Sequence, residues 1–293
     1  MKVDASRIVL GTAQLGRHYG IANTTGNPGR RKAIKILETA WNAGIRMFDT
    51  APGYESESIL GEFIAAEGLS RDAKVSAKIP AIGNRADCRE FISHSIENSL
   101  SKLGTQSIEV LYFHAAADVH WLRDDAVSFF SLFDAYPIRS WGISIYDHED
   151  LRECGDAAAD MAIQFPFNLI DRRFENNSFP QGRRFARSIF QQGLLAADRL
   201  RSDAPAELKN FHQRILQDSH QMGFSLKQLS LSFLVSQTCF DFFLVGAESS
   251  EQVRDIIDTE LVDSVNFDAL SKRWGAYVSR EWMDPRQWTY TAS

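Results

Sequence analysis

Four residues whose side chains can do acid–base chemistry follow short apolar runs of the chain. Asp49 and Tyr54 both lie in the segment FDTAPGY, just after the run IRMF. Lys78 follows the run VSA, and His114 follows the run VLYF. If these runs are neighbouring strands of a barrel, their carboxyl ends lie on one face, where active sites form. We therefore expect the four side chains to share one site.

Together these residue types suit the protonation of an oxygen atom. A free phenol has a pKa of about 10, and an ammonium group beside it stabilises the phenolate, so a lysine makes a tyrosine a better acid near neutral pH. A carboxylate keeps that lysine charged and oriented, and a histidine opposite can hold a carbonyl oxygen. Reduction of an aldehyde or ketone needs this arrangement and a hydride from a cofactor.

The elements that must position these residues alternate regularly. Apolar runs typical of buried strands lie at 8–13, 46–51, 75–79, 109–114, 139–145, 161–166, 187–191 and 241–247, and a helical pattern or a long loop follows each. Eight such units predict an α/β fold of the (β/α)8 TIM barrel type, formed as one domain over 1–293. An open doubly wound sheet is the alternative, which the lack of a GxGxxG segment after any run weakens.

Helices are expected from the 3.6-residue spacing of apolar residues. The predicted ranges are 30–44, 56–68, 86–104, 119–136, 148–157, 205–222, 225–236 and 249–260. A further C-terminal helix over 266–279 has no strand after it, so we expect it to pack outside the barrel.

Composition argues against several classes of protein. The net charge is −6, and without basic runs the chain is not expected to bind nucleic acid or an anionic membrane. The N-terminus lacks the apolar core of a secretory signal, and no stretch approaches the roughly 20 apolar residues of a membrane helix. The widely spaced Cys88, Cys154 and Cys239 are expected to be free thiols of a cytoplasmic protein.

Several motifs, taken in order, resemble the aldo-keto reductase family. They are GTAQLG, FDTAxxY followed by SExxLG, the lysine and histidine at strand ends, WGIS, and LVGAESSEQV. The resemblance covers about 7–257 and implies a (β/α)8 barrel that binds a nicotinamide dinucleotide across its mouth. It implies that Tyr54 donates the proton, Lys78 lowers the pKa of a phenol at that position, Asp49 orients Lys78, and His114 positions the substrate carbonyl.

The same resemblance implies a set of cofactor-binding residues. They are Thr12, Asp49, Ser144, Gln164, Arg187, Ser188, Phe190, Gly193, Gly246, Ala247, Glu248 and Gln252. Three positions depart from the family pattern. Ile145 replaces an asparagine beside the carboxamide-binding serine, Arg187 replaces an aromatic residue on the nicotinamide, and Glu55 replaces the glycine that commonly follows the tyrosine. Ser249 and Gln252 have the spacing of a capping box. We expect NADPH as the cofactor, with NADH as the alternative, and no metal.

Three other functions compete with a carbonyl reductase. A cofactor-binding redox sensor of the same fold would retain the barrel without turnover, whereas a Schiff-base lyase would need an uncharged Lys78. The hypothesis of a metal hydrolase has little support, because no HxH or HxxxH pair lies at a predicted strand end. The substrate is expected to be a small carbonyl compound, sugar-like or hydroxylated. Candidates for the entrance are His18, Tyr19, His120, Trp121, Phe167, Asn168, Arg172 and Arg173.

Overall fold

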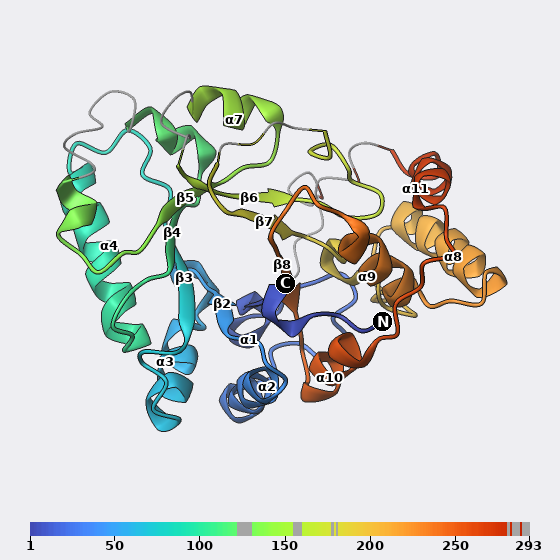
Figure 1. Cartoon of the computed structure of the whole chain (residues 1–293), viewed down its shortest axis with the longest axis horizontal. Coiled ribbons are helices and arrows are strands. Elements are labelled where there is room, and N and C mark those ends of the chain that lie inside the picture. The colour runs from blue at the N-terminus through green and yellow to red at the C-terminus, as the bar shows by residue number, and fades with distance from the viewer. Residues whose placement is uncertain are drawn as a thin grey trace.

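The chain folds around a closed barrel of eight parallel strands (Figure 1). The computed structural model describes residues 1–121, 131–154, 160–176, 179, 181–279, 282 and 288. Strand order follows the sequence, and β8 pairs with β1 to close the ring. This confirms the predicted (β/α)8 barrel. The strands are β1 (Ile8–Gly11), β2 (Met47–Asp49), β3 (Lys74–Ile79), β4 (Val110–Phe113), β5 (Trp141–Ser144), β6 (Ala162–Pro166), β7 (Arg184–Arg187) and β8 (Phe242–Gly246).

The prediction for the seventh strand was wrong in position. It was expected at 187–191, but β7 ends at Arg187, where that range begins. Ser188 and Gln191 have φ angles of 56° and 46°, which an extended strand does not allow. The apolar residues of that range belong instead to a loop over the carboxyl end of the barrel.

Helices surround the barrel (Figure 1). They are α2 (Arg30–Asn42), α3 (Glu57–Ala66), α4 (Cys88–Leu103), α7 (His148–Cys154), α8 (Ala206–Gln221), α9 (Leu226–Ser236) and α10 (Ser250–Asp258). These match the predicted helices within a few residues. Of the predicted helix over 119–136, residues 122–130 lie outside the described part, as do 155–157 of the helix over 148–157. The short helix α1 (Ala13–Gly16) was not predicted.

Alternation of side chains along the strands divides the core into two parts. One set fills the barrel interior and includes Val9, Met47, Tyr112 and Phe185, all buried. The larger set packs between the barrel and the helices. Because the interior is filled with apolar side chains, polar residues gather where this filling ends, which includes the carboxyl ends of the strands.

The additional C-terminal helix, α11 (Phe267–Gly275), packs against α8 at the periphery (Figure 1). Trp274 is fully buried, and its indole Nε1 donates a hydrogen bond to Asp218 at 3.0 Å. Arg273 pairs with the same carboxylate at 3.1 Å. Among the described residues, no helix is long and apolar enough to cross a bilayer.

We predict that Trp274→Ala lowers the free energy of unfolding by about 3–5 kcal/mol, as expected when a large buried aromatic side chain is deleted. Urea denaturation followed by circular dichroism measures the change. Trp274→Phe serves as the control, because it keeps most of the buried area while losing the hydrogen bond to Asp218. Equal stability of Trp274→Ala and the wild type would contradict a contribution of the packing of α11 to the stability of the fold.

Candidate active site

A buried ion pair lies at the centre of the carboxyl face of the barrel. Asp49 ends β2 and Lys78 lies near the end of β3; both are about 2–3% exposed. The Lys78 ammonium donates to Oδ1 of Asp49. Gln164, on β6, donates from Nε2 to the other oxygen, Oδ2, at 2.9 Å. Each oxygen of the carboxylate therefore has a donor, which is what a buried charge requires.

The surroundings keep Lys78 charged. Burial alone would lower the pKa of Lys78, but the Asp49 carboxylate and the nearby Tyr54 phenol outweigh it and raise that pKa above its ordinary value. A Schiff-base lysine needs an uncharged amine. This electrostatic environment therefore opposes the lyase alternative.

Tyr54 closes one side of the site from the short helix η2 (Pro52–Tyr54). The Lys78 ammonium lies 5.2 Å from the centroid of its ring. The ring of His114, which follows β4, lies 6.4 Å away at an angle of 87°. The structure thus brings together all four residues selected from the sequence.

The backbone around Tyr54 is held by a close contact with α1. A Cβ atom on Gly16 would lie 1.9 Å from the carbonyl oxygen of Tyr54, so only glycine fits there. Glu55, where the family pattern has glycine, adopts a left-handed conformation with φ 60°. Such a conformation is uncommon for a residue with a side chain, and it turns the chain sharply between Tyr54 and α3.

His114 is neutral at ordinary pH. Partial burial of its ring, and then the positive charge of Lys78, lower the pKa of His114 to about 4, with smaller contributions from Arg187 and Arg17. Asp49 opposes the shift. A neutral imidazole donates a hydrogen bond from one nitrogen only. His114 is therefore suited to orient an oxygen atom without carrying a charge.

Two arginines lie beside this site. The guanidinium of Arg17 is 5.1 Å from the centroid of the Tyr54 ring. Arg187, at the end of β7, stacks on Tyr146 at 3.8 Å and donates to the carbonyl oxygen of Ile145 at 2.9 Å. Within the described residues Arg187 forms no ion pair.

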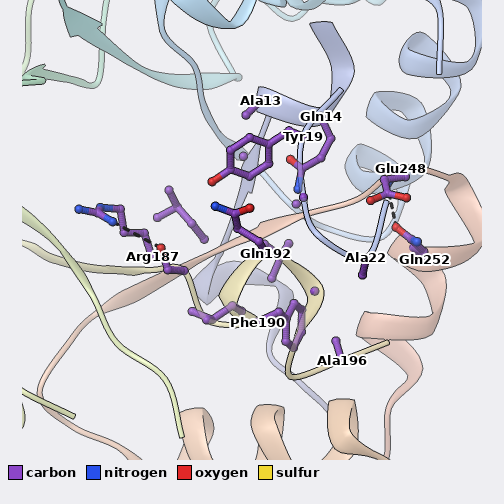
Figure 2. A pocket seen from close by; sticks show the side chains of 18 of the residues that line it. Ala13, Gln14, Tyr19, Ala22, Arg187, Phe190, Gln192, Ala196, Glu248 and Gln252 are labelled. Carbon is purple, nitrogen blue, oxygen red and sulfur yellow. Dashed lines mark hydrogen bonds between the residues drawn. The ribbon is translucent and has the colours of Figure 1, made fainter. Parts of the chain in front are cut away.

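A cavity of about 650 Å³ runs from this site to the amino end of α10. Figure 2 shows Arg187 toward one end, Glu248 and Gln252 toward the other, and Tyr19 and Gln192 between them. The four predicted catalytic residues line it, together with Ser144, Gln164, Arg187, Ser188, Phe190, Gly193, Gly246, Glu248 and Gln252.

Two predicted cofactor residues do not line the cavity. Thr12 is fully buried, and its hydroxyl donates to the carbonyl oxygen of Asp49 at 3.0 Å. It also shares a hydrogen bond of 2.7 Å with Ser56. Ala247 is buried behind the end of β8. Both therefore support the residues around the cavity rather than forming its wall.

Several lining residues were not selected from the sequence, namely Arg17, Tyr146, Gln192 and Lys227. Tyr19, a candidate for the entrance, does line the cavity. Tyr19 and Gln192 belong to two loops that meet over the cavity, where the amide of Ala22 donates to the carbonyl oxygen of Gln192. The other entrance candidates, His18, His120, Trp121, Phe167, Asn168, Arg172 and Arg173, are not part of the lining.

The amino end of α10 forms the far wall of the cavity. Ser249 caps the helix by accepting from the amide of Gln252, as its spacing predicts. The amide oxygen of Gln252 accepts from the backbone of Glu248 at 2.7 Å. Burial raises the pKa of Glu248. Nearby, Lys227 forms an ion pair with Asp255, so its charge is balanced there.

Comparisons with known proteins identify the family of this chain. The model of the aldo/keto reductase family matches residues 7–270. Aldo-keto reductase YhdN of Bacillus subtilis is 30% identical over 187 residues, which are 61% of this chain and 55% of that protein. NADH-specific methylglyoxal reductase of Escherichia coli is 24% identical, with 92% of this chain and 94% of that one covered.

Solved structures show the same fold. The aldo-keto reductase AKR11C1 from Bacillus halodurans in its holo form is similar, with a TM-score of 0.71 and 18% identity over 95% of both chains. The glycerol dehydrogenase AKR11B4 from Gluconobacter oxydans has a TM-score of 0.63 and 22% identity, covering 98% of this chain and 95% of that one.

We predict that His114 titrates with a midpoint near its lowered pKa of about 4 rather than 6.5. As the pH falls below 6.5, the unfolded chain binds this proton first, so the contribution of His114 to stability is lost between 6.5 and 4. NMR titration of the imidazole signals measures the midpoint, and the spectrum of His114→Asn assigns the peak. A midpoint near 6.5 would contradict the environment described above.

Proposed function

This chain belongs to the aldo/keto reductase family and is an oxidoreductase, and we propose that it reduces the carbonyl group of a small molecule to an alcohol with NADPH. One observation carries the proposal: a tyrosine and a neutral histidine face each other beside a buried lysine–aspartate pair. That set can hold a carbonyl oxygen and deliver a proton to it.

In this proposal each of the four residues has one task. Tyr54 donates its phenolic proton to the carbonyl oxygen as negative charge develops there. The Lys78 ammonium stabilises the phenolate that remains, and Asp49 keeps that ammonium charged and oriented. His114 donates a hydrogen bond that fixes the carbonyl in line with Tyr54. Bound nicotinamide would supply the hydride to the carbonyl carbon.

Of the tyrosines that line the cavity, Tyr54 has the Lys78 ammonium against its ring. Burial raises the pKa of Tyr19 to about 12, which opposes loss of its proton. The ring of Tyr146 packs against Arg187 rather than Lys78. The proximity of Lys78 therefore distinguishes Tyr54 from both.

Residues at both ends of the cavity support the binding of a nicotinamide dinucleotide. Ser144 is 3% exposed and lines the cavity, and within the described residues its hydroxyl has no hydrogen-bond partner. Ser144 and Gln164 would hold the carboxamide at the catalytic end. At the other end, the amino terminus of α10 offers backbone N–H groups of the kind that bind phosphate.

The cofactor preference depends on the charges at that end. The family resemblance predicts NADPH, whose 2′-phosphate would lie near the amino end of α10. Glu248 brings a carboxylate to this wall, and the charge of Lys227 is balanced by Asp255. NADPH binding would therefore proceed against repulsion by Glu248.

We predict that Tyr54→Phe lowers kcat by about 10²–10⁴-fold, the usual range for loss of a general acid, while cofactor affinity changes little. Fluorescence titration with NADPH and with NADH measures binding, and a panel of aldehydes and hydroxylated ketones measures turnover. Phenylalanine keeps the ring in place, so lost turnover reports on the hydroxyl.

A matched control comes from Tyr146→Phe, which removes a phenol from the same cavity away from Lys78. Its kcat should fall far less than that of Tyr54→Phe. If the wild type binds a cofactor tightly but reduces no member of the panel, the reductase proposal fails. Equal losses in the two variants would instead overturn the role given to Tyr54.

We predict that Glu248→Gln tightens NADPH relative to NADH by about five- to tenfold, because one carboxylate that repels the 2′-phosphate is removed at a partly screened site. The ratio of the two dissociation constants from fluorescence titration is the measurement. Glu251→Gln is the control, since Glu251 is exposed on α10 and does not line the cavity. An unchanged ratio in Glu248→Gln would contradict this contact.

A further inference from the structure

The catalytic end of the cavity carries more positive charge than its own carboxylates balance. Lys78 is neutralised by Asp49. Arg17 and Arg187 both line the cavity, and within the described residues neither has a carboxylate within ion-pair distance. Asp171 is close enough to Arg187 for their charges to interact, but its ion pair is with Arg173. Neither guanidinium is therefore neutralised by a direct ion pair with a described residue.

Of these two arginines, Arg17 has more N–H groups available to a ligand. It directly follows α1 and is exposed, and its single hydrogen bond among the described residues is a long one, 3.4 Å to the carbonyl oxygen of Gly53. Its guanidinium lies 5.1 Å from the Tyr54 ring and 5.6 Å from the Tyr19 ring. A planar group with five donors held between two aromatic rings is well suited to bind an anion.

Arg187 is held more firmly. It donates to the carbonyl oxygen of Ile145 at 2.9 Å and to the Ser188 hydroxyl at 3.4 Å, and its face is covered by Tyr146. Its contribution to ligand binding is therefore its charge rather than direct hydrogen bonds.

The same cations act on His114. Burial is the main reason that the pKa of His114 is lowered, and the positive charges of Lys78, Arg187 and Arg17 lower it further. These charges would favour an anion beside the imidazole.

We propose that the substrate carries an anionic group, a carboxylate or a phosphate, close to its carbonyl, and that Arg17 binds this group. The inference rests on the proposed carbonyl reduction and names the class of substrate. The anion would lie on the outer side of Tyr54, between Arg17 and His114, with the carbonyl directed inward toward the Tyr54 hydroxyl.

The test compares carbonyl compounds that differ by the anion. One pair is 4-oxobutanoate and butanal, and the other is glyceraldehyde 3-phosphate and glyceraldehyde. For the wild type, kcat/KM should favour the charged member of at least one pair by about tenfold or more, the size expected of a charge-assisted hydrogen bond. The pair with the larger preference identifies carboxylate or phosphate as the anion.

Arg17→Met should lower this charged-to-neutral ratio of kcat/KM by about tenfold, mainly through KM, because the lost interaction holds the bound substrate. Arg17→Lys should recover part of the ratio. Arg152→Met is the matched control: Arg152 is exposed on α7, outside the cavity, so the ratio should stay at the wild-type value.

The outcomes separate this inference from the proposed function. If the wild type reduces neutral carbonyls as well as charged ones, or if Arg17→Met leaves the ratio unchanged, the anionic substrate is overturned while the reductase stands. If no carbonyl compound is reduced with either cofactor, the proposed function itself is overturned. NMR adds a readout without turnover, since Arg17→Met should raise the midpoint of His114.

Discussion

The buried ion pair between Lys78 and Asp49 is the constraint on which the site depends. Two charges removed from water are costly unless every polar atom finds a partner, and loss of one member costs about 3–5 kcal/mol. Here Gln164 and the carbonyl oxygen of Thr50 complete the set of partners. Because these groups come from β2, β3 and β6, the pair can exist only when the barrel is closed and in register.

Charge is divided along the cavity, and this division follows from the fold. The catalytic end has Lys78, Arg17 and Arg187 with one carboxylate among them, whereas the far wall has Glu248 and the balanced Lys227–Asp255 pair. Burial, together with the positive charges of Lys78, Arg187 and Arg17, keeps His114 neutral. In the proposed reaction the same charges would stabilise negative charge on a carbonyl oxygen and favour an anionic substrate.

The sequence predicted those features that depend on periodicity and chain order. Apolar runs with polar residues at their ends identified the barrel, and Asp49, Lys78 and His114 lie at those ends. The position of β7 could not be predicted, because the left-handed conformations of Ser188 and Gln191 have no glycine to signal them. Arg17 was missed for a related reason: its loop is positioned by contacts with distant segments, such as the one between Ala22 and Gln192.

Arg17 and Tyr54 are positioned by one local contact, which would link the proposed anion binding to the proposed proton transfer. Gly16 ends α1 and lies against the carbonyl oxygen of Tyr54 so closely that no side chain fits between them. Arg17 is the next residue, so the contact that fixes the phenol also fixes the base of the arginine side chain. Glu55 completes the arrangement by turning the chain away in a left-handed conformation. A shift of this backbone would displace the proton donor and the cation together.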